Sequence, residues 1–406
     1  MASYHQMGHD SANLLCEEHL AGYAGAILSP VNETEDKARK EVEQYRSERF
    51  EIVFDPQLYY PTSNRGKLPL WDYFPADVDT ADRSSSAWWR QIVRRLCKVV
   101  QRLQVSAVCS PADVPRVYRP SYYELHSKIA HDLEERASAL GVSVLQTLIV
   151  RLADIAQSET DRAAEIASIV TRQATSRVYL VLVTDVHPRR ELREVEDLKA
   201  AMRLIRYLEE AGTAVLVGYA SSDVILWIAA GASACATGKF FNLRRFTPSR
   251  WAPDEDGGGQ LPYWFEEGVM GFLREPDLVR VRNAGFLSAA SLSNPYGKEI
   301  LSRLDKAAPV DKPERPAWLA LGWRQFLFWF SDFENRLRTQ QTDPDQVLRN
   351  AERIANALED KKILMEERQN DFGWLRPWRR AIPPGTGLLG EPHDHLPASQ
   401  QHGRGA

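Results

Sequence analysis

The sequence has few cysteines, and they are not paired along the chain. Its four cysteines lie far apart and form no C-x-x-C pair: Cys16, Cys97, Cys109 and Cys235. This spacing argues against a zinc ribbon, and it gives no disulfide framework in a chain of 406 residues. We therefore expect a reducing, cytoplasmic location.

A strong charge of one sign and a long apolar run are also missing. The formal net charge of −4 excludes a globally basic nucleic-acid binder, although a local basic face can still attract an anion. No stretch approaches the ~20 apolar residues of a membrane span, and residues 1–20 contain no basic segment followed by an apolar run. We expect neither membrane association nor an export signal.

Common catalytic and cofactor motifs are not found either. The chain has no P-loop, no G-x-G-x-x-G motif and no Ser-His-Asp order. His393, His395 and His402 lie in a Pro- and Gly-rich tail, where an H-x-H pattern is more typical of an unstructured end than of a metal site. The sequence therefore predicts no metal site, and it identifies no cofactor.

What the sequence does contain is a regular alternation of short apolar runs and amphipathic helical stretches, which is typical of a parallel sheet. Seven predicted strands span residues 25–30, 50–56, 105–111, 142–150, 178–186, 214–219 and 234–238. A closed barrel needs an eighth strand, and residues 277–283 are the best candidate. We therefore predict an α/β fold, a (β/α)8 barrel, ahead of an open doubly wound sheet.

Composition divides the chain into four parts. Residues 1–21 are an N-terminal segment, and residues 22–308 form the predicted barrel domain. A Pro- and charge-rich linker leads into residues 309–381, where Trp-rich helical patterns predict a helical appendage. Residues 382–406 have no periodicity and are expected to be disordered.

Catalytic groups of such a barrel lie at the C-terminal ends of its strands. Asp55, Asp185 and His187 follow predicted strands and are the candidate catalytic residues, because a carboxylate and an imidazole at one rim can exchange a proton. Arg189 or Arg190 could bind an anion beside them. The alternative is structural: Asp185 caps a turn, and His187 is a loop residue before Pro188.

Candidate binding residues come mainly from the last two strands. Gly218 and Gly238 end these strands, and their turns resemble those that hold phosphate through backbone N–H groups. The same glycines could simply mark tight strand ends. Gln57 and Tyr219 lie at strand ends and complete the predicted substrate-binding set.

A basic segment follows the last of these strands. In residues 238–251, aromatic residues are interleaved with Lys239, Arg244, Arg245 and Arg250, a pattern that suits phosphate contacts together with base stacking. The alternative is a strand edge that packs on the helical appendage. A long segment without periodicity, residues 56–86, carries several aromatics and predicts a packed loop that could cover a ligand.

Residues 22–61 and 214–246 resemble the early and late barrel segments of the tRNA-guanine transglycosylase-like superfamily, including its DNA-modifying relatives. Asp55 stands where the family has its first aspartate, although Pro56 and Gln57 replace the usual serine and glycine. This resemblance implies a barrel fold and recognition of a nucleic acid or nucleobase.

Two departures from the family pattern concern its chemistry. Cys235, Ala236 and Thr237 surround the place of the nucleophilic carboxylate, and no C-x-C-x-x-C zinc set follows. Without a carboxylate to attack the sugar, ordinary base exchange is expected to be lost or altered. Three functions remain open: a transglycosylase-like protein that binds nucleic acid or a nucleotide, an enzyme on a small phosphorylated substrate, and a non-catalytic subunit that meets protein partners through its Trp-rich appendage.

Overall fold

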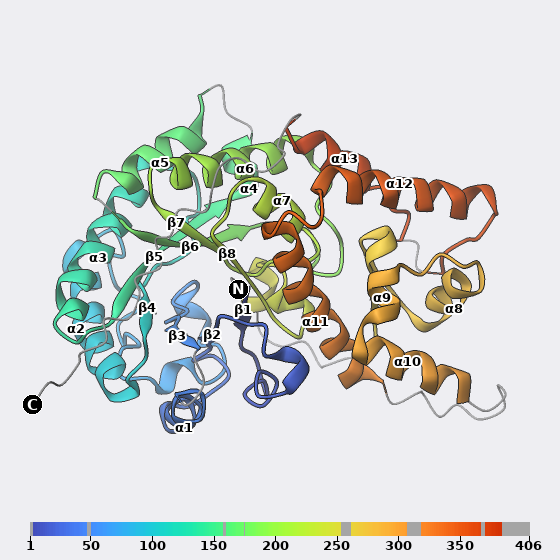
Figure 1. Cartoon of the computed structure of the whole chain (residues 1–406). Helices are drawn as coiled ribbons and strands as arrows, with labels where there is room; N and C mark the ends of the chain where they lie inside the picture. Colours follow the sequence, from blue (N-terminus) through green and yellow to red (C-terminus); the bar gives the residue numbers. More distant parts are fainter. Residues whose placement is uncertain are drawn as a thin grey trace, which may run out of the picture.

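Eight parallel strands form a closed barrel in the order β1 to β8 (Figure 1). The computed structural model describes residues 3–46, 50–156, 160–173, 175–252, 261–306, 318–366 and 370–383. The strands are β1 Ser3–Gln6, β2 Gly25–Leu28, β3 Glu51–Phe54, β4 Ala107–Cys109, β5 Ser143–Arg151, β6 Arg177–Val183, β7 Ala214–Val217 and β8 Ala234–Thr237. The predicted (β/α)8 barrel and its seven predicted strands are thus confirmed.

Helices surround the barrel because each buries one apolar face on the sheet. The helices between the strands are α1 Glu35–Tyr45, α2 Ser86–Leu103, α3 Pro120–Ser138, α4 Leu152–Ala156, α5 Arg162–Thr171, α6 Val195–Glu210 and α7 Val224–Ala229. In α2, for example, Trp89, Val93, Leu96 and Val100 recur at three- and four-residue spacing and are all buried.

The eighth strand was predicted at the wrong end of the chain. Residues 277–283 lie in helix α8 (Glu275–Asn283), which has Pro276 in its first turn and buries Leu278 and Val281 three residues apart. The barrel is closed instead by β1, which pairs with β2 on one side and with β8 on the other. Part of the predicted N-terminal segment therefore belongs to the barrel.

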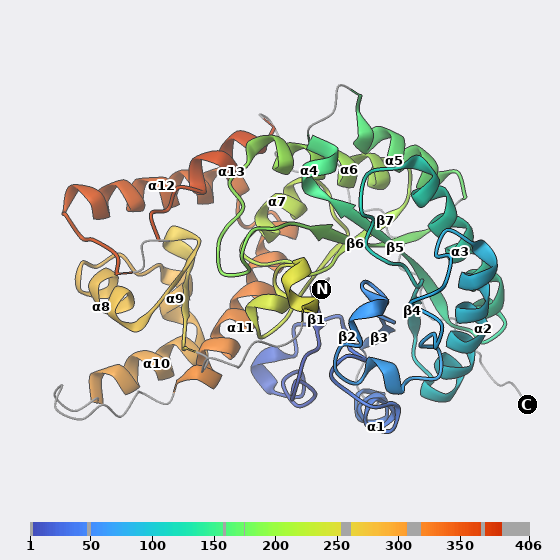
Figure 2. The ribbon, with the colours of Figure 1, turned by 180° about the vertical axis from the view of Figure 1, so that it is seen from behind.

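The C-terminal third is helical and packs against the barrel (Figures 1 and 2). Its elements are the hairpin β9 Trp264–Glu266 and β10 Gly271–Leu273, and the helices α8, α9 Ala289–Ser293, α10 Pro295–Lys306, α11 Leu319–Arg338, α12 Pro344–Asp360 and α13 Leu375–Ala381. Helix α11 lies beside β1 and α7, where the hydroxyl of Ser3 donates to Glu334 and Arg338 donates to the carbonyl of Ala232 at 2.9 Å. Of the predicted tail, residues 384–406 lie outside the described residues, as do its three histidines.

The loop after β3 is packed, as predicted. It contains two short 3-10 helices, Pro61–Ser63 and Leu68–Leu70. The indole N–H of Trp71 donates to the carbonyls of Pro30 and Glu33, both at 3.1 Å, so this loop is fixed on the loop after β2.

Candidate functional site

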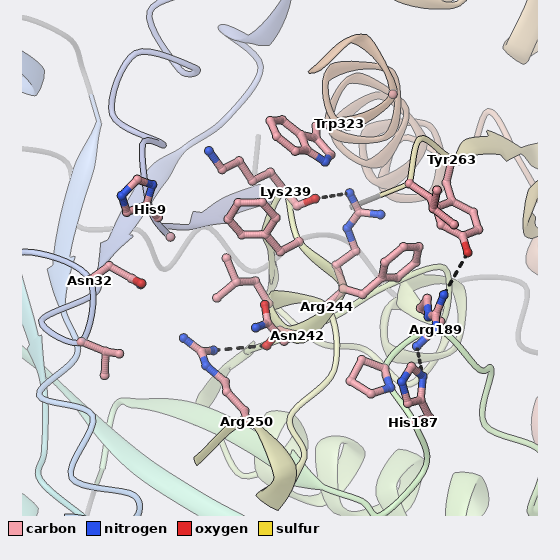
Figure 3. A pocket seen from close by; sticks show the side chains of 18 of the residues that line it. His9, Asn32, His187, Arg189, Lys239, Asn242, Arg244, Arg250, Tyr263 and Trp323 are labelled. Carbon is pink, nitrogen blue, oxygen red and sulfur yellow. Dashed lines mark hydrogen bonds between the residues drawn. The ribbon is translucent and has the colours of Figure 1, made fainter. Parts of the chain in front are cut away.

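A cavity of about 860 Å³ opens at the C-terminal ends of the barrel strands. Its walls come from loops that follow β1, β2, β3, β6 and β8, and from the first turns of α11 (Figure 3). Among the polar, charged and aromatic residues that line it are His9, Asn32, Arg65, His187, Arg189, Lys239, Arg244, Arg250, Tyr263 and Trp323. The cavity therefore lies where barrels of this kind place their active sites.

The charge of this cavity is one-sided. Arg65, Arg189, Lys239, Arg244 and Arg250 contribute five cationic side chains, and no carboxylate is found among the described residues that line it. The carboxylate of Asp10, next to the cavity, lies 2.8 Å from His9 Nδ1. We refer to this space as the cationic cavity.

Lys239 is nearly buried in the wall, at 5% exposure. Its ammonium donates to the carbonyl of Asp10 at 2.9 Å, and it lies 4.8 Å from the ring centre of Phe240 and 5.0 Å from that of Trp323. Burial lowers the pKa of Lys239, because its charge is only partly solvated there. An anion in the cavity would compensate this charge.

Arg244 holds the loop after β8 in shape. Its Nε and Nη2 donate to the carbonyls of Gly238 and Lys239, each at 2.8 Å, and its guanidinium lies 3.7 Å from the ring centre of Phe326 in α11. Burial lowers its pKa to about 9. Arg244 is thus a buried cation held by carbonyls and aromatic rings.

His187 lies beside Arg189, on the side of the cavity away from His9 and Asn32 (Figure 3). Its Nδ1 accepts a hydrogen bond from the backbone N–H of Arg189 at 3.2 Å. Partial burial, with Arg189 and Arg190 nearby, lowers the pKa of His187, so its imidazole is neutral at pH 7. With Nδ1 as the acceptor, Nε2 carries the proton.

Asp55 lies inside the barrel and not on the cavity wall. Its carboxylate accepts from the backbone N–H of Gln57 at 3.0 Å and from the hydroxyl of Tyr59 at 2.8 Å. Burial raises the pKa of Asp55 to about 6, against the effect of these hydrogen bonds and of Arg250. Several polar side chains surround it, and we call the following set the inner polar cluster: Gln6, Asp55, Gln57, Tyr59, Tyr179 and Tyr219.

Two other predicted site residues lie apart from the cavity wall. The side chain of Asp185 is 81% exposed and lies 4.0 Å from Arg151, so it does not join His187 in the cavity. Arg245 is buried between Glu191 at 3.1 Å and Asp223 at 3.4 Å, where it joins the loops after β6 and β7 to the loop after β8.

The two glycines have packing roles. A Cβ atom on Gly218 would lie 2.6 Å from the ring of Tyr179, and one on Gly238 would lie 2.5 Å from the Cβ of Leu243. The N–H of Gly218 donates to the carbonyl of Leu180 at 2.8 Å, within the sheet. This amide is therefore not available to a phosphate.

Four of these wall residues are not among the site residues predicted from the sequence: His9, Arg65, Tyr263 and Trp323. His9 follows the closing strand β1, which the sequence did not reveal. Arg65 and Tyr263 lie in the predicted barrel domain, and Trp323 belongs to the predicted appendage. The aromatic pattern of residues 319–338, which includes Trp323, was the available signal. Within the described ranges, no three His, Cys, Asp or Glu side chains gather into a group that could hold a metal ion.

Comparisons with known proteins concern the fold. No protein-family model matches the chain, and no curated protein matches it. Among solved structures, the match with an L-ribulose 3-epimerase includes 84% of this chain and 97% of the epimerase chain, at 12% identity and a TM-score of 0.39. Deoxyribose phosphate aldolase from Aeropyrum pernix covers 58% of this chain and is covered to 84%, at 16% identity and a TM-score of 0.35.

A family 2 AP endonuclease from Brucella melitensis covers 59% of this chain and is covered to 90%, at 12% identity and a TM-score of 0.35. Likenesses this distant assign no activity to the chain. No described helix is long and apolar enough to cross a membrane. The closed parallel barrel that β1 to β8 form is of the TIM type.

Proposed function

We propose that the cationic cavity binds a small phosphorylated molecule and that the protein acts on it as an enzyme. The observation that carries this proposal is the set of five cationic side chains that line one cavity at the C-terminal end of a barrel, with no carboxylate among its described wall residues. A cleft lined by charges of one sign concentrates ligands of the opposite charge.

Phosphate suits these side chains better than a single negative charge does. Guanidinium groups offer several N–H donors in a plane that matches phosphate oxygens, and Arg189 and Arg250 present such groups from two sides of the cavity (Figure 3). Lys239 and Arg244 keep their charges at a cost in solvation, which a bound anion would offset.

His187 is the acid–base candidate of this site. It lines the cavity, its imidazole is neutral at pH 7, and its Nε2 is not the atom that Arg189 holds. A neutral imidazole can accept or donate a proton near pH 7 when the substrate lies within hydrogen-bond distance.

Nucleic-acid binding and a transglycosylase-like reaction have less support. A groove that follows a polynucleotide backbone needs exposed cations, and Arg244 and Arg245 are each only 3% exposed. Strand β8 carries Cys235, Ala236 and Thr237 at the place where base exchange needs a carboxylate, and all three are buried. We therefore favour a small ligand.

The test is calorimetric titration of inorganic phosphate and pyrophosphate into the full chain and into Arg189→Gln. We expect pyrophosphate to bind more tightly than phosphate, because two phosphoryl groups can contact cations on both walls. Arg189→Gln should weaken pyrophosphate binding roughly fivefold, which corresponds to about 1 kcal/mol for one charged hydrogen bond.

Arg190→Gln is the matched control, since Arg190 is the exposed neighbour of Arg189 and does not line the cavity. Its pyrophosphate affinity should stay close to that of the wild type. Equal losses in the two variants, or no binding of either anion to the wild type, would show the proposed function to be wrong. Tighter binding of a single-stranded oligonucleotide, with a steep salt dependence, would favour nucleic acid instead.

A further inference from the structure

The inner polar cluster contains polar atoms that the fold does not use. Within the described part of the chain, Gln6 Nε2, Gln57 Nε2 and the Tyr219 hydroxyl have no partner at hydrogen-bond distance and angle, although these residues are 0%, 0% and 4% exposed. The polar side chains of Gln57 and Tyr59 are the neighbours of the Tyr219 hydroxyl. Buried donors without partners are rare because each costs free energy on folding. Three of them in one place require an explanation.

Reversing the side-chain amide of Gln6 or Gln57 would not remove the unused atoms, because the amide oxygen would then be left without a donor in place of the nitrogen. Gln6 Oε1 accepts from the Tyr179 hydroxyl at 2.8 Å. Gln57 Oε1 accepts from the Ser29 hydroxyl at 2.9 Å and from the backbone N–H of Val31 at 3.4 Å. Both amide oxygens are thus held by donors of the protein, and both amide nitrogens are left to face the interior.

The backbone at two of these residues adopts a conformation that side chains rarely take. Gln57 has φ +51° and Tyr219 has φ +57°, at the ends of β3 and β7. Neither is a glycine, so the left-handed conformation is strained, and such strain is frequently found at functional sites. It directs both side chains to the same buried region, where they lie near Asp55 and Tyr59.

Two connections join this region to the cationic cavity. The guanidinium of Arg250, a wall residue, lies 5.4 Å from the ring centre of Tyr219. Asn32, another wall residue, donates from Nδ2 to Ser29 Oγ at 2.8 Å, and Ser29 in turn donates to Gln57. The cavity and the inner polar cluster are therefore linked by the side chain of Arg250 and by the hydrogen bonds that lead from Asn32 through Ser29 to Gln57.

We propose that the inner polar cluster is the second half of the binding site and receives a hydroxyl or carbonyl group of the phosphorylated ligand. This inference rests on the proposed function, because the phosphate would be held by the cationic cavity. Two amide N–H donors and a phenol match the oxygen atoms of a hydroxyl or carbonyl, and Asp55 can accept from a hydroxyl. Entry of this group requires Arg250 to leave the ring of Tyr219 and to follow the phosphate.

The experiment compares inorganic phosphate with three phosphorylated probes, namely glycerol 3-phosphate, dihydroxyacetone phosphate and ribose 5-phosphate. Calorimetry of the full chain measures the affinity of each probe. The affinity ratio is the affinity of the tightest-binding phosphorylated probe divided by the affinity of inorganic phosphate. We expect a ratio of at least about 10 in the wild type. Tyr219→Phe keeps the aromatic ring and removes only the unused hydroxyl, and it should lower the ratio at least about fivefold.

Tyr73→Phe is the matched control. The Tyr73 hydroxyl is also buried near Asp55, but it donates to the carbonyl of Pro56 at 2.9 Å and therefore serves the fold. Tyr73→Phe should lower the melting temperature and leave the affinity ratio unchanged. Tyr219→Phe should change the ratio and lower the melting temperature less than Tyr73→Phe does, because the Tyr219 hydroxyl has no partner at hydrogen-bond distance and angle in the fold.

The outcomes separate the two proposals. A ratio near one in the wild type, or the same ratio in Tyr219→Phe, would show this inference to be wrong while phosphate binding by the cationic cavity stands. If neither inorganic phosphate nor any of the three phosphorylated probes binds to the wild type, the proposed function is wrong and this inference with it.

Discussion

At the scale of single residues, the buried carboxyl of Asp55 has a consequence for stability. Burial raises its pKa from 3.8 to about 6 in the folded protein. The folded state thus binds the proton more tightly than the unfolded state, so the contribution of Asp55 to stability is greatest below pH 4 and is lost as the pH rises through 6. A shift of this size corresponds to about 3 kcal/mol.

The variant Asp55→Asn tests the direction of this pH dependence of stability. The difference in unfolding free energy between the variant and the wild type should move in favour of the variant between pH 4.5 and pH 8, by about 2 kcal/mol, because roughly 1 kcal/mol of the total is already lost at pH 4.5. Urea denaturation at several pH values measures it. Asp185→Asn, which removes a carboxyl that is 81% exposed, is the matched control. A difference that does not change with pH for Asp55→Asn would contradict the raised pKa.

Residue patterns predicted part of the site. The basic segment after β8 supplied Lys239, Arg244 and Arg250 to the cavity wall, because loops that follow barrel strands meet at one end. Arg245, their neighbour, is buried between carboxylates from two other loops. A pairing between residues so distant in the chain leaves no local pattern, so sequence reasoning could not separate Arg245 from the other three.

At the scale of elements, strand pairing around the barrel is uneven. Strands β5 and β6 pair from Gln146 opposite Val178 to Arg151 opposite Val183, whereas the described pairing of β7 with β8 is limited to Leu216–Ala234 and Val217–Cys235. Local opening needs less free energy where fewer backbone hydrogen bonds must break. The pairing of β7 with β8, and the equally short pairing of β3 with β4, should therefore open more readily than that of β5 with β6.

Hydrogen exchange followed by mass spectrometry measures this order. Peptides that contain β4 and β8 should exchange faster than peptides that contain β5 and β6, under conditions where the protein stays folded. Equal protection of all eight strands would mean that the barrel opens only by global unfolding. Pyrophosphate should slow exchange after β8 if it contacts Lys239, and it should leave β5 unchanged.

Two elements show why the sequence misled us about the eighth strand. The segment Val279–Asn283 alternates apolar and basic residues like an exposed strand, yet Glu275 and Pro276 before it form a helix start. The true strand, Ser3–Gln6, reads S-Y-H-Q and has no apolar run. Two of its side chains have specific partners, Ser3 with Glu334 and Tyr4 with Glu51 at 2.5 Å, and only the tertiary structure supplies those partners.

At the scale of the whole molecule, the C-terminal helices and the barrel share contacts that make separate unfolding unfavourable. Arg324 of α11 forms hydrogen bonds of 2.6 to 2.9 Å with Glu17, and the Tyr23 hydroxyl donates to Leu327 at 2.9 Å. The indole of Trp378 in α13 donates to Leu192 at 2.7 Å. We expect one unfolding transition for the described chain.

Tryptophan fluorescence and far-ultraviolet circular dichroism, recorded along one urea titration, test this cooperativity. Five of the eleven tryptophans lie in the barrel part of the chain and six in its C-terminal third, so the fluorescence reports on both parts. It should therefore change in one step that coincides with the loss of the dichroism signal. Separate midpoints would show that the C-terminal helices unfold on their own, as an appendage would.

The Trp-rich part of the chain is mostly inward-facing. Trp318, Trp329, Trp374 and Trp378 are buried within the protein, and Trp323 lines the cationic cavity. The tryptophans thus pack the chain's own core, which a composition count could not distinguish from an exposed docking surface. Association with protein subunits through this region stays a prediction.

Closure of the barrel by β1 sets an order of events during synthesis on the ribosome. Strand β1 leaves the ribosome first, but one of its neighbours, β8, begins only at residue 234, and α11, which lies beside it, begins at residue 319. At roughly 5–20 residues per second, one edge of the nascent sheet stays open for tens of seconds. Because β1 has the polar sequence SYHQ and no apolar run to attract another chain, we expect the unpaired edge to resist aggregation during that interval.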